Sequence, residues 1–245
     1  MRHRSVARHI FLQRLGSIVE RLPRFYIAVQ RLRSARKGFA GHIVSKGDVL
    51  LIDAFPRSGS SFALKAFRVS NPEIARKVGT HVHTAAHVAE AVRLGVPAMV
   101  LIRDPDGAVP SLLAMSIQNN AVVPRNEMET RRLMRLALDR YIAFHEDLLA
   151  LAEHVMIVDF PEMTRDYGAV MRRLNAHFGT RFEVFDHTPE NAAALMKSTR
   201  RHLSPDPERD VIKAQLRDTY AAPEFKAKRQ TAKSLYDRIR KDHAT

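Results

Sequence analysis

The stretch DVLLIDAFPRSGSSFALKAF, from Asp48 to Phe67, decides the fold of this chain. It begins with the apolar run of a buried strand, passes through a turn rich in Gly and Ser, and ends in a helical pattern. At such a junction the first N–H groups of the helix and its dipole favour an anion. The usual nucleotide-loop signature G-x-x-x-x-G-K-[ST] fails twice, because Ala54 replaces the first Gly and Ser60 replaces the Lys. The stretch alone therefore predicts either a phosphate-binding loop or a turn capped by Ser.

Apolar strands and helices alternate along the chain after this unit. We expect strands at 77–82, 98–102 and 155–158, and helices at 84–94, 107–118, 127–153 and from Pro161 to about Phe178, with two amphipathic helical stretches after Ser198. Uninterrupted apolar strands separated by helices indicate a parallel sheet covered on both faces. The sequence thus predicts an α/β protein with a three-layer α/β/α, P-loop-like fold and a central parallel sheet. Ligands of such sheets bind beyond the carboxyl ends of the strands.

The composition is that of an ordinary globular protein with a strong positive charge. The 245 residues are 45% hydrophobic and 27% charged, and the formal net charge is +14. The absence of Cys excludes disulfides and Cys-based metal sites, which fits a reducing compartment. No apolar run approaches the ~18 residues of a membrane-spanning helix, and the N-terminus lacks the features of an export signal. We therefore expect a cytoplasmic protein with an anionic substrate or partner.

Residues 1–47 form a distinct segment before the α/β domain, which we place at 48–245 with a helical C-terminal tail. The segment holds eleven Lys and Arg but one acid, Glu20. Apolar residues at helical spacing predict a basic amphipathic helix that Pro23 ends or kinks. This helix either packs on the domain with its basic face in solvent or docks peripherally on an anionic membrane, at its inner face. Nucleic-acid binding is less favoured, because no reader motif accompanies the charge.

A second motif follows the strand at 98–102. Arg103 stands just past the strand end, and Ser111 comes eight residues later on the next helix. The two side chains can reach one phosphate, the Arg through a bidentate ionic contact and the Ser through its hydroxyl. The alternative is that Arg103 pairs with Asp104 or Asp106 and that Ser111 is a surface hydroxyl.

Together the two motifs resemble those of the sulfotransferases that use 3′-phosphoadenosine-5′-phosphosulfate (PAPS). By this resemblance, the chain looks like a bacterial-type member with a P-loop sulfotransferase domain. FPRSGSSF is similar to the 5′-phosphosulfate loop of that family, [YF]-P-[KR]-S-G-[TS]-[TS]-[WFL], and RDPDGAVPS to its 3′-phosphate motif, R-[ND]-P-x-[DE]-x-x-x-S. The chain departs from the second pattern at Gly107, where an acid is usual. The resemblance covers roughly Val49 to Phe178, including VMIVDF and the helix that ends HFG.

The resemblance implies roles for named residues. Arg57 would contact the phosphosulfate and stabilise charge on the departing nucleotide, and Arg103 and Ser111 would hold the 3′-phosphate. Phe62 would contact the adenine or belong to the core. The 5′-phosphosulfate would be held by Arg57 together with the rest of the loop: Ser58, Gly59, Ser60 and Ser61. Sulfuryl transfer needs no Mg²⁺-binding Ser or Thr of the kind used in triphosphate chemistry, so no metal is expected.

The acceptor must lose a proton, and a His is suited to remove it. The resembling family carries its catalytic His in a K-T-H segment, and His81 stands 22 residues before Arg103 at the matching place, preceded by Thr80. Val78 departs from the pattern near the Lys. Alternative bases are His83 and a carboxylate, Glu73 or Glu90. A metal site made of His81, His83 and His87 is disfavoured, since no acidic or Cys ligand completes it.

These features predict an enzyme that transfers a sulfuryl group from PAPS to a hydroxyl or amine. The acceptor would be a small molecule, a carbohydrate or a lipid, bound near the segments 119–130 and 180–225. One rival is a P-loop nucleotide-dependent kinase, which the missing Lys after Gly59 argues against. The other is a non-enzymatic basic protein that binds nucleic acid or membrane through residues 1–47.

Overall fold

A four-stranded parallel sheet forms the centre of the computed structural model, which describes residues 5–20, 22–37, 42–197 and 206–243. The strands lie in the order β2 (Val78–Thr80), β1 (Leu50–Ala54), β3 (Ala98–Ile102) and β4 (Met156–Asp159). All three neighbouring pairs are parallel. The predicted α/β class with a central parallel sheet is therefore confirmed.

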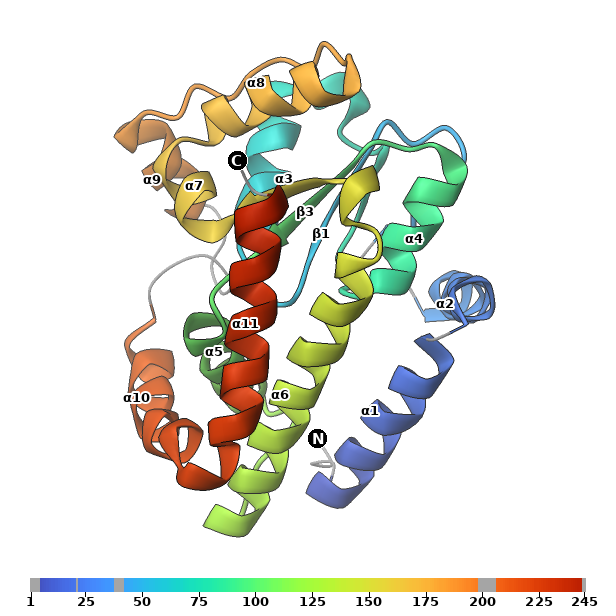
Figure 1. Cartoon of the computed structure of the whole chain (residues 1–245). Coiled ribbons are helices and arrows are strands. Elements are labelled where there is room, and N and C mark those ends of the chain that lie inside the picture. The colour runs from blue at the N-terminus through green and yellow to red at the C-terminus, as the bar shows by residue number, and fades with distance from the viewer. Residues whose placement is uncertain (1–4, 21, 38–41, 198–205, 244–245) are drawn as a thin grey trace.

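Helices cover both faces of this sheet (Figure 1). The first layer comprises α3 (Ser60–Ser70), α7 (Phe160–Arg165), α8 (Tyr167–Phe178) and α9 (Pro189–Lys197). The second comprises α4 (Ala85–Leu94), α5 (Pro105–Gln118), α6 (Glu127–Leu149), α10 (Pro207–Ala221) and α11 (Lys226–His243). Short 3-10 helices occupy Pro72–Ile74, Ala152–His154 and Pro223–Phe225. At the N-terminus, α1 (Val6–Glu20) contacts α6, and α2 (Pro23–Lys37) contacts α4.

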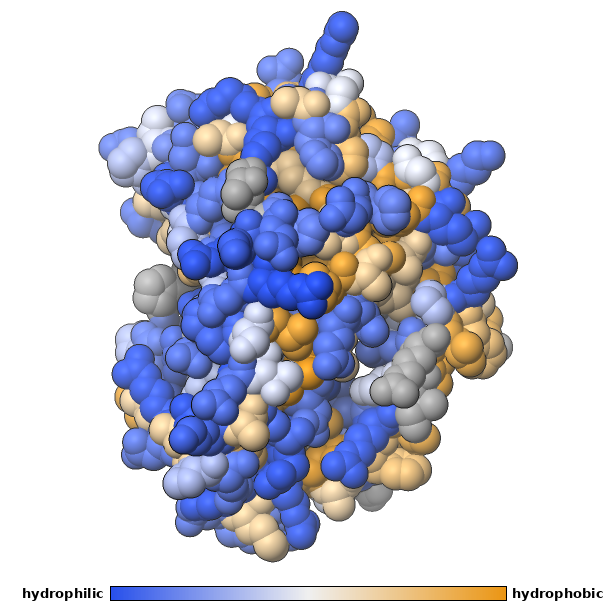
Figure 2. Space-filling view, viewed as in Figure 1, coloured by the Kyte–Doolittle hydropathy of each residue, from blue (hydrophilic) through white to orange (hydrophobic). Residues whose placement is uncertain are grey.

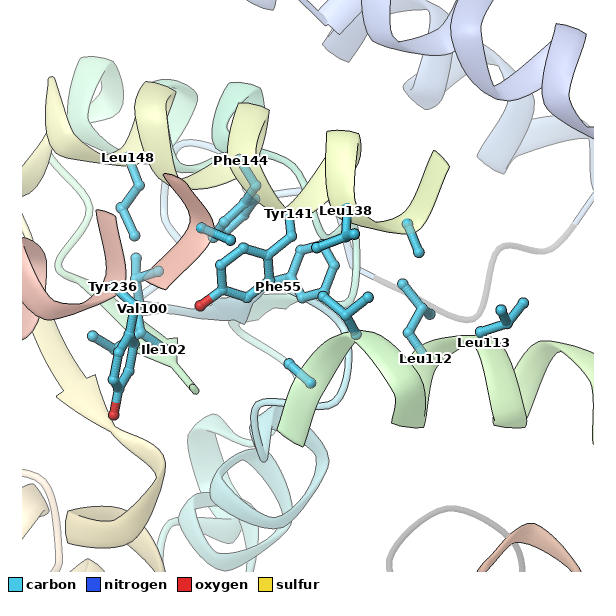
Figure 3. Close-up of a cluster of buried hydrophobic side chains, with 14 of the residues drawn as sticks. Phe55, Val100, Ile102, Leu112, Leu113, Leu138, Tyr141, Phe144, Leu148 and Tyr236 are labelled. Atoms are coloured by element: carbon cyan, nitrogen blue, oxygen red, sulfur yellow. The ribbon is translucent and has the colours of Figure 1, made fainter. Parts of the chain in front are cut away.

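The burial of β1 explains why its sequence is apolar throughout. All five of its residues are buried, and successive side chains point to opposite faces. Leu50 and Ile52 join the cluster under α3 and α8, whereas Leu51 joins the cluster under α5 and α6. Figure 3 shows the second cluster, in which the Phe55 ring packs edge-on against Tyr141 with centroids 4.9 Å apart.

The order of the strands brings the two predicted motifs together. From β1 the chain passes through α3 to β2 on one side, then returns through α4 to β3 on the other side of β1. The connections after β1 and β3 thus diverge to opposite faces of the sheet, which leaves a crevice at the carboxyl ends of these strands. Ala54 pairs with Leu101, so residues 55–59 and Arg103 follow neighbouring strand ends.

Two local features differ from the sequence prediction. The expected helix from Pro161 to Phe178 is two helices, because Asp166 leaves helical geometry (φ −153°, ψ 93°) and its carboxylate accepts from the N–H of Ala169 to cap α8. The helix α9 was not predicted. The predicted interruption of the helical pattern at Pro23 is present, because α1 ends at Glu20 and Pro23 is the first residue of α2, where a missing N–H has no consequence.

Candidate functional site

The loop between β1 and α3 has an unusual backbone. Gly59 has φ of 95°, and a Cβ at this position would lie 2.2 Å from Met163 Cε and 3.2 Å from Phe160 Cδ2. Both the dihedral angle and the lack of space require Gly. Arg57 also has positive φ, 75°, a region that costs a residue with a side chain about 1–3 kcal/mol. The loop is therefore a strained element that its neighbours hold in one shape.

The N-terminus of α3 offers donors to an anion. Its N-cap is Gly59, which has no side chain that could cap the helix. The N–H groups of Ser60 and Ser61 lie in the first turn, where the helix itself provides no acceptor. Ser58 is fully buried, and its Oγ has no hydrogen-bond partner among the residues that the structure describes. A buried hydroxyl without a partner costs about 1–3 kcal/mol. A phosphate or sulfate group at this loop would satisfy these donors.

Arg103 leaves β3 and turns toward the same loop. Its Nη1 donates to the carbonyl oxygen of Arg57 at 2.9 Å, and its guanidinium lies 4.1 Å from the centre of the Phe160 ring. The Tyr141 hydroxyl donates to the carbonyl oxygen of Arg103 at 2.6 Å. A Cβ at Gly107 would lie 2.9 Å from Arg103 Nε. The Gly that departs from the family pattern therefore makes room for this position of Arg103.

The two motifs are joined by a direct hydrogen bond. Arg57 Nε donates to Ser111 Oγ at 3.0 Å, and Arg57 Nη1 lies 3.5 Å from Met115 Sδ. The loop between β1 and α3 is thus connected to α5 through one guanidinium. This contact fixes the direction of Arg57 along α5.

The alternative partners considered for Arg103 are occupied elsewhere. Asp104 lies 3.2 Å from Lys233 Nζ, and Asp106 accepts a hydrogen bond from the Tyr220 hydroxyl at 2.8 Å. Within the described part of the chain, neither carboxylate forms an ion pair with Arg103. The simple Arg–Asp pairing within RDPDG is therefore absent from this geometry.

Cationic side chains from three segments gather around the loop. Burial, then repulsion from Arg209 and Arg103, lowers the pKa of Arg57 to about 10. Burial also lowers the pKa of Arg103. For Lys213, burial and the charges of Arg103, Arg217 and Arg57 lower the pKa. Positive charges that lie close together and are partly buried repel one another and lose hydration, which costs free energy. Such an arrangement is typical of a site that binds an anion.

Arg209 and Lys213, both on α10, were not predicted as site residues. They stand four residues apart, so they share one face of the helix. Arg209 is only 7% exposed, and its Nε donates to Gln118 Oε1 at 2.8 Å, which orients it beside the end of α5. The sequence signal was only a pair of basic residues at helical spacing, and nothing in it indicated that α10 packs on α5.

His81 contacts the first turn of α3, next to the loop that follows β1. Its Nδ1 is 2.8 Å from Thr80 Oγ1, and its Nε2 is 3.2 Å from Ser61 Oγ. Both partners are hydroxyls, which can either donate or accept a hydrogen bond, so the two contacts are compatible with either tautomer of the imidazole. The backbone of His81 also has positive φ, 60°. The structure therefore brings His81 to the loop residues with which the sequence grouped it.

His87 belongs to the core. It is fully buried; its Nε2 accepts from the Val44 N–H at 2.9 Å, and its Nδ1 donates to Asp53 Oδ2 at 2.6 Å. Both ring nitrogens are occupied, which leaves none for a metal ion. No group of three or more His, Cys, Asp or Glu side chains that could hold a metal is found among the described residues.

His83 shares the carboxylate of Asp53. Its backbone N–H donates to Asp53 Oδ1 at 3.2 Å, and its ring Nδ1 lies 2.8 Å from the carbonyl oxygen of Ala54. Burial alone would raise the pKa of Asp53, but the hydrogen bonds and charges of His83 and His87 lower it well below its usual range. Burial by itself would lower the pKa of His83, but the hydrogen bond to Asp53 and the negative charge of Asp53 have the larger effect, so the pKa of His83 is raised. A raised pKa favours an imidazolium, which cannot accept a proton, so His83 is the weaker candidate base.

The two carboxylate alternatives have other surroundings. Glu90 pairs with Arg93 at 2.7 Å and with Arg31 at 3.2 Å, and the hydrogen bond from Arg93 lowers the pKa of Glu90. A carboxylate held in this way is a poor base. Glu73 is exposed in the short helix that follows α3.

Phe62 is 5% exposed and lies in the core. Its ring packs edge-on against Tyr167 and Phe185, with centroids 6.1 and 6.3 Å apart, and lies 5.7 Å from the His187 ring. Of the two roles considered for Phe62, this placement matches the core role. The ring supports the first turn of α3 from within the protein.

A surface hollow of about 480 Å³ borders this aromatic group at Phe185 and His187. Half of its eight lining residues are charged: Arg165, Asp166, Arg172 and Asp186. None of the predicted site residues lines it. Residues 198–205, within the segment expected to border the acceptor, lie outside the described residues.

Comparisons with known proteins find a likeness among solved structures but none in sequence. No family model matches the chain, and no curated protein matches it in sequence. Among solved structures it is similar to mouse sulfotransferase SULT7A1, crystallised in complex with PAP, with a TM-score of 0.43 and 13% identity. That likeness covers 82% of this chain and 86% of the mouse chain. At such a TM-score it carries no weight for function, which we therefore derive from the residues of the site.

Proposed function

We propose that this protein transfers a sulfuryl group from PAPS to a hydroxyl or amine of an acceptor molecule. The observation that carries the proposal is the convergence of the two motifs. Arg57 bonds to Ser111 at 3.0 Å, and Arg103 bonds to the carbonyl oxygen of Arg57 at 2.9 Å, at the ends of two neighbouring strands. Two guanidinium groups, one from a residue of the strained loop and one bonded to that loop, suit a ligand with phosphates at two ends.

The residues present fit such a donor. The unpartnered hydroxyl of Ser58 and the first N–H groups of α3 suit the 5′-phosphosulfate, together with Arg57. Arg103 and Ser111 would hold the 3′-phosphate. The side chains of Arg209 and Lys213 add positive charge beside them. The donor supplies an activated sulfuryl group, bonded through oxygen to the 5′-phosphate.

His81 would act on the acceptor. Its Nε2 would take the proton as the acceptor oxygen or nitrogen forms a bond to sulfur and the bond from sulfur to the bridging phosphate oxygen breaks. Arg57 would stabilise the negative charge that this oxygen gains. The products are the sulfated acceptor and adenosine 3′,5′-bisphosphate. Both side chains lie at the loop, since His81 Nε2 is 3.2 Å from Ser61 Oγ and Arg57, a loop residue, bonds to Ser111 Oγ at 3.0 Å.

Calorimetry with two nucleotides tests the donor assignment. Adenosine 3′,5′-bisphosphate should bind at least tenfold more tightly than adenosine 5′-monophosphate, because a charge-assisted contact is worth roughly 1.5–3 kcal/mol. Arg103→Ala should remove this preference, whereas Arg238→Ala, an exposed Arg on α11, should not. Equal affinity for the two nucleotides in the parent protein would overturn the proposal. So would Mg²⁺-dependent ATP binding that survives Arg103→Ala, since it would indicate a kinase.

Transfer itself is measured with labelled PAPS against a panel of phenols, sugars, lipids and amines. The parent protein should label one class, and His81→Ala should abolish labelling while the bisphosphate still binds. Retention of near-normal turnover by His81→Ala would assign the base to another residue.

A further inference from the structure

Exposed apolar side chains are concentrated on α1, α2 and their junction. Among the described residues, twelve large apolar side chains are strongly exposed, and six of them lie between positions 11 and 32. These six, which we call the outer face, are Phe11 (62% exposed), Leu12 (42%), Leu15 (45%), Leu22 (64%), Phe25 (58%) and Leu32 (56%). Isolated exposed apolar residues are ordinary, but a cluster of this kind marks an interaction surface.

The outer face follows helical spacing in α1. Phe11 and Leu15 stand four residues apart and Leu12 lies between them, so the three side chains share one side of the helix. Val6 projects from the opposite side and is 3% exposed, packed into the core under α6. The helix α1 therefore has apolar residues on both sides, of which the protein covers only one.

The same division holds in α2. Tyr26 and Ile27 are 8% and 1% exposed and pack with Ile43 on the domain, while Phe25 faces solvent. Arg31 also ties the helix to the domain, because its Nη2 donates to the carbonyl oxygen of Val44 at 3.0 Å. Phe25 is thus exposed on the solvent side of a helix whose opposite side already packs on the domain.

Basic side chains accompany the outer face. Arg8, Arg14 and Arg24 are exposed on the same two helices, and the only acid of residues 1–47 is Glu20. Arg8 stands three and four residues before Phe11 and Leu12, so it lies on their side of α1. Figure 2 shows apolar side chains among hydrophilic ones toward the lower right, where Figure 1 places α1 and α2.

We propose that the outer face docks on an anionic lipid bilayer, with the Phe and Leu side chains among the acyl chains and the arginines at the headgroups. Large apolar side chains beside cationic ones are complementary to the boundary between acyl chains and anionic headgroups. A nucleic-acid backbone offers the charge but no apolar layer for Phe11, Leu22 and Phe25. Within the described residues, no helix is long and apolar enough to cross a bilayer. The two helices therefore lie on the membrane surface.

The test is flotation of the full-length protein with vesicles of phosphatidylcholine alone or mixed equally with phosphatidylglycerol. The parent protein should float with the mixed vesicles at low salt and dissociate as salt rises. F11S/L15S/F25S should reduce the bound fraction at least tenfold. The control M128S/V211S removes two apolar side chains of comparable exposure, 55% and 58%, from α6 and α10 and should leave binding unchanged.

A second pair of variants isolates the charge. R8Q/R14Q/R24Q should weaken binding to the mixed vesicles about 100-fold. R132Q/R181Q/R238Q, with the same loss of charge at exposed sites elsewhere, should weaken it far less. Circular dichroism and nucleotide affinity establish that each variant is folded. Equal binding to neutral vesicles, equal loss in both charge variants, or binding to duplex DNA with none to vesicles would each overturn the proposal.

Discussion

Arg57 Nε donates a hydrogen bond to Ser111 Oγ, which joins the loop after β1 to the helix after β3 over 54 residues of sequence. The bond ties the group proposed to stabilise the leaving phosphate to a group proposed to hold the 3′-phosphate. Removal of either side chain therefore removes this contact from the other, and the two are expected to act together.

Arg57 and Ser111 should act as a coupled pair. Arg57→Ala is expected to lower the single-turnover rate about 100- to 1000-fold, as removal of a preorganised donor does. Arg57→Lys should retain part of this rate, because the charge persists but the Nε donor to Ser111 is lost. A double-mutant cycle with Ser111→Ala should show strong non-additivity. The control is Ser116→Ala in the same helix, whose hydroxyl bonds to the Leu112 carbonyl. Additive losses would contradict the coupling.

The charge of Lys213 should destabilise the protein without ligand and strengthen the binding of an anionic ligand. Burial and the neighbouring Arg103, Arg217 and Arg57 lower the pKa of Lys213. Removal of its charge in Lys213→Gln should therefore raise the Tm without ligand, while it weakens binding of adenosine 3′,5′-bisphosphate about three- to tenfold. Differential scanning fluorimetry and calorimetry measure the two effects. Lys241→Gln on α11 is the control; a lower Tm for Lys213→Gln would show a structural role instead.

Gly59 should tolerate no side chain, and Gly47 provides the matched comparison. Both residues have positive φ, 95° and 102°, but a Cβ on Gly59 meets Met163 at 2.2 Å whereas a Cβ on Gly47 meets nothing within 4 Å. Both Ala variants carry the dihedral strain, roughly 1–3 kcal/mol. Only Gly59→Ala should add the cost of displacing Met163. Denaturant unfolding measures the difference, and equal losses of unfolding free energy would show that the contact with Met163 is readily relieved.

The pair of Asp53 and His83 should make stability depend on pH. Because the folded pKa of His83 is raised from 6.5, its proton stabilises the fold fully below pH 6.5. That contribution is lost as the pH rises through the folded pKa. The difference in Tm between the parent and His83→Gln should therefore be largest below pH 6.5 and shrink at alkaline pH. His154→Gln, an exposed His, is the control. A difference that grows with pH would reverse the assigned sign.

Short-range patterns were sufficient for much of the fold. The strands at 98–102 and around 156–159 follow from apolar runs, and the loop after β1 follows from Gly and Ser before a helical pattern. The break at Asp166 was missed because an Asp can lie within a helix or cap the start of a new one. Which of the two occurs here depends on how the flanking helices α7 and α8 pack, which the local sequence does not show. The short helix α9 offered no strong signal, since it has only nine residues.

The roles of buried polar residues depended on contacts between distant segments. Asp53 reads as one acid within an apolar strand, and only the folded chain supplies His83 and His87, which hold it ionised. The three histidines look alike in sequence, yet His87 is fully bonded in the core while His81 lies against Ser61. Spacing alone could not separate them.

The sequence by itself determined the β1 loop with Arg57 and Gly59, and the eight-residue spacing from Arg103 to Ser111. These depend on neighbours within a strand or a turn of helix, where local geometry follows from local residue types. The tertiary structure alone decided that Arg57 meets Ser111, and that α10 adds Arg209 and Lys213 beside them. The order of the strands and the packing of α10 on α5 arise from burial of apolar surface across the whole chain, which no local pattern specifies.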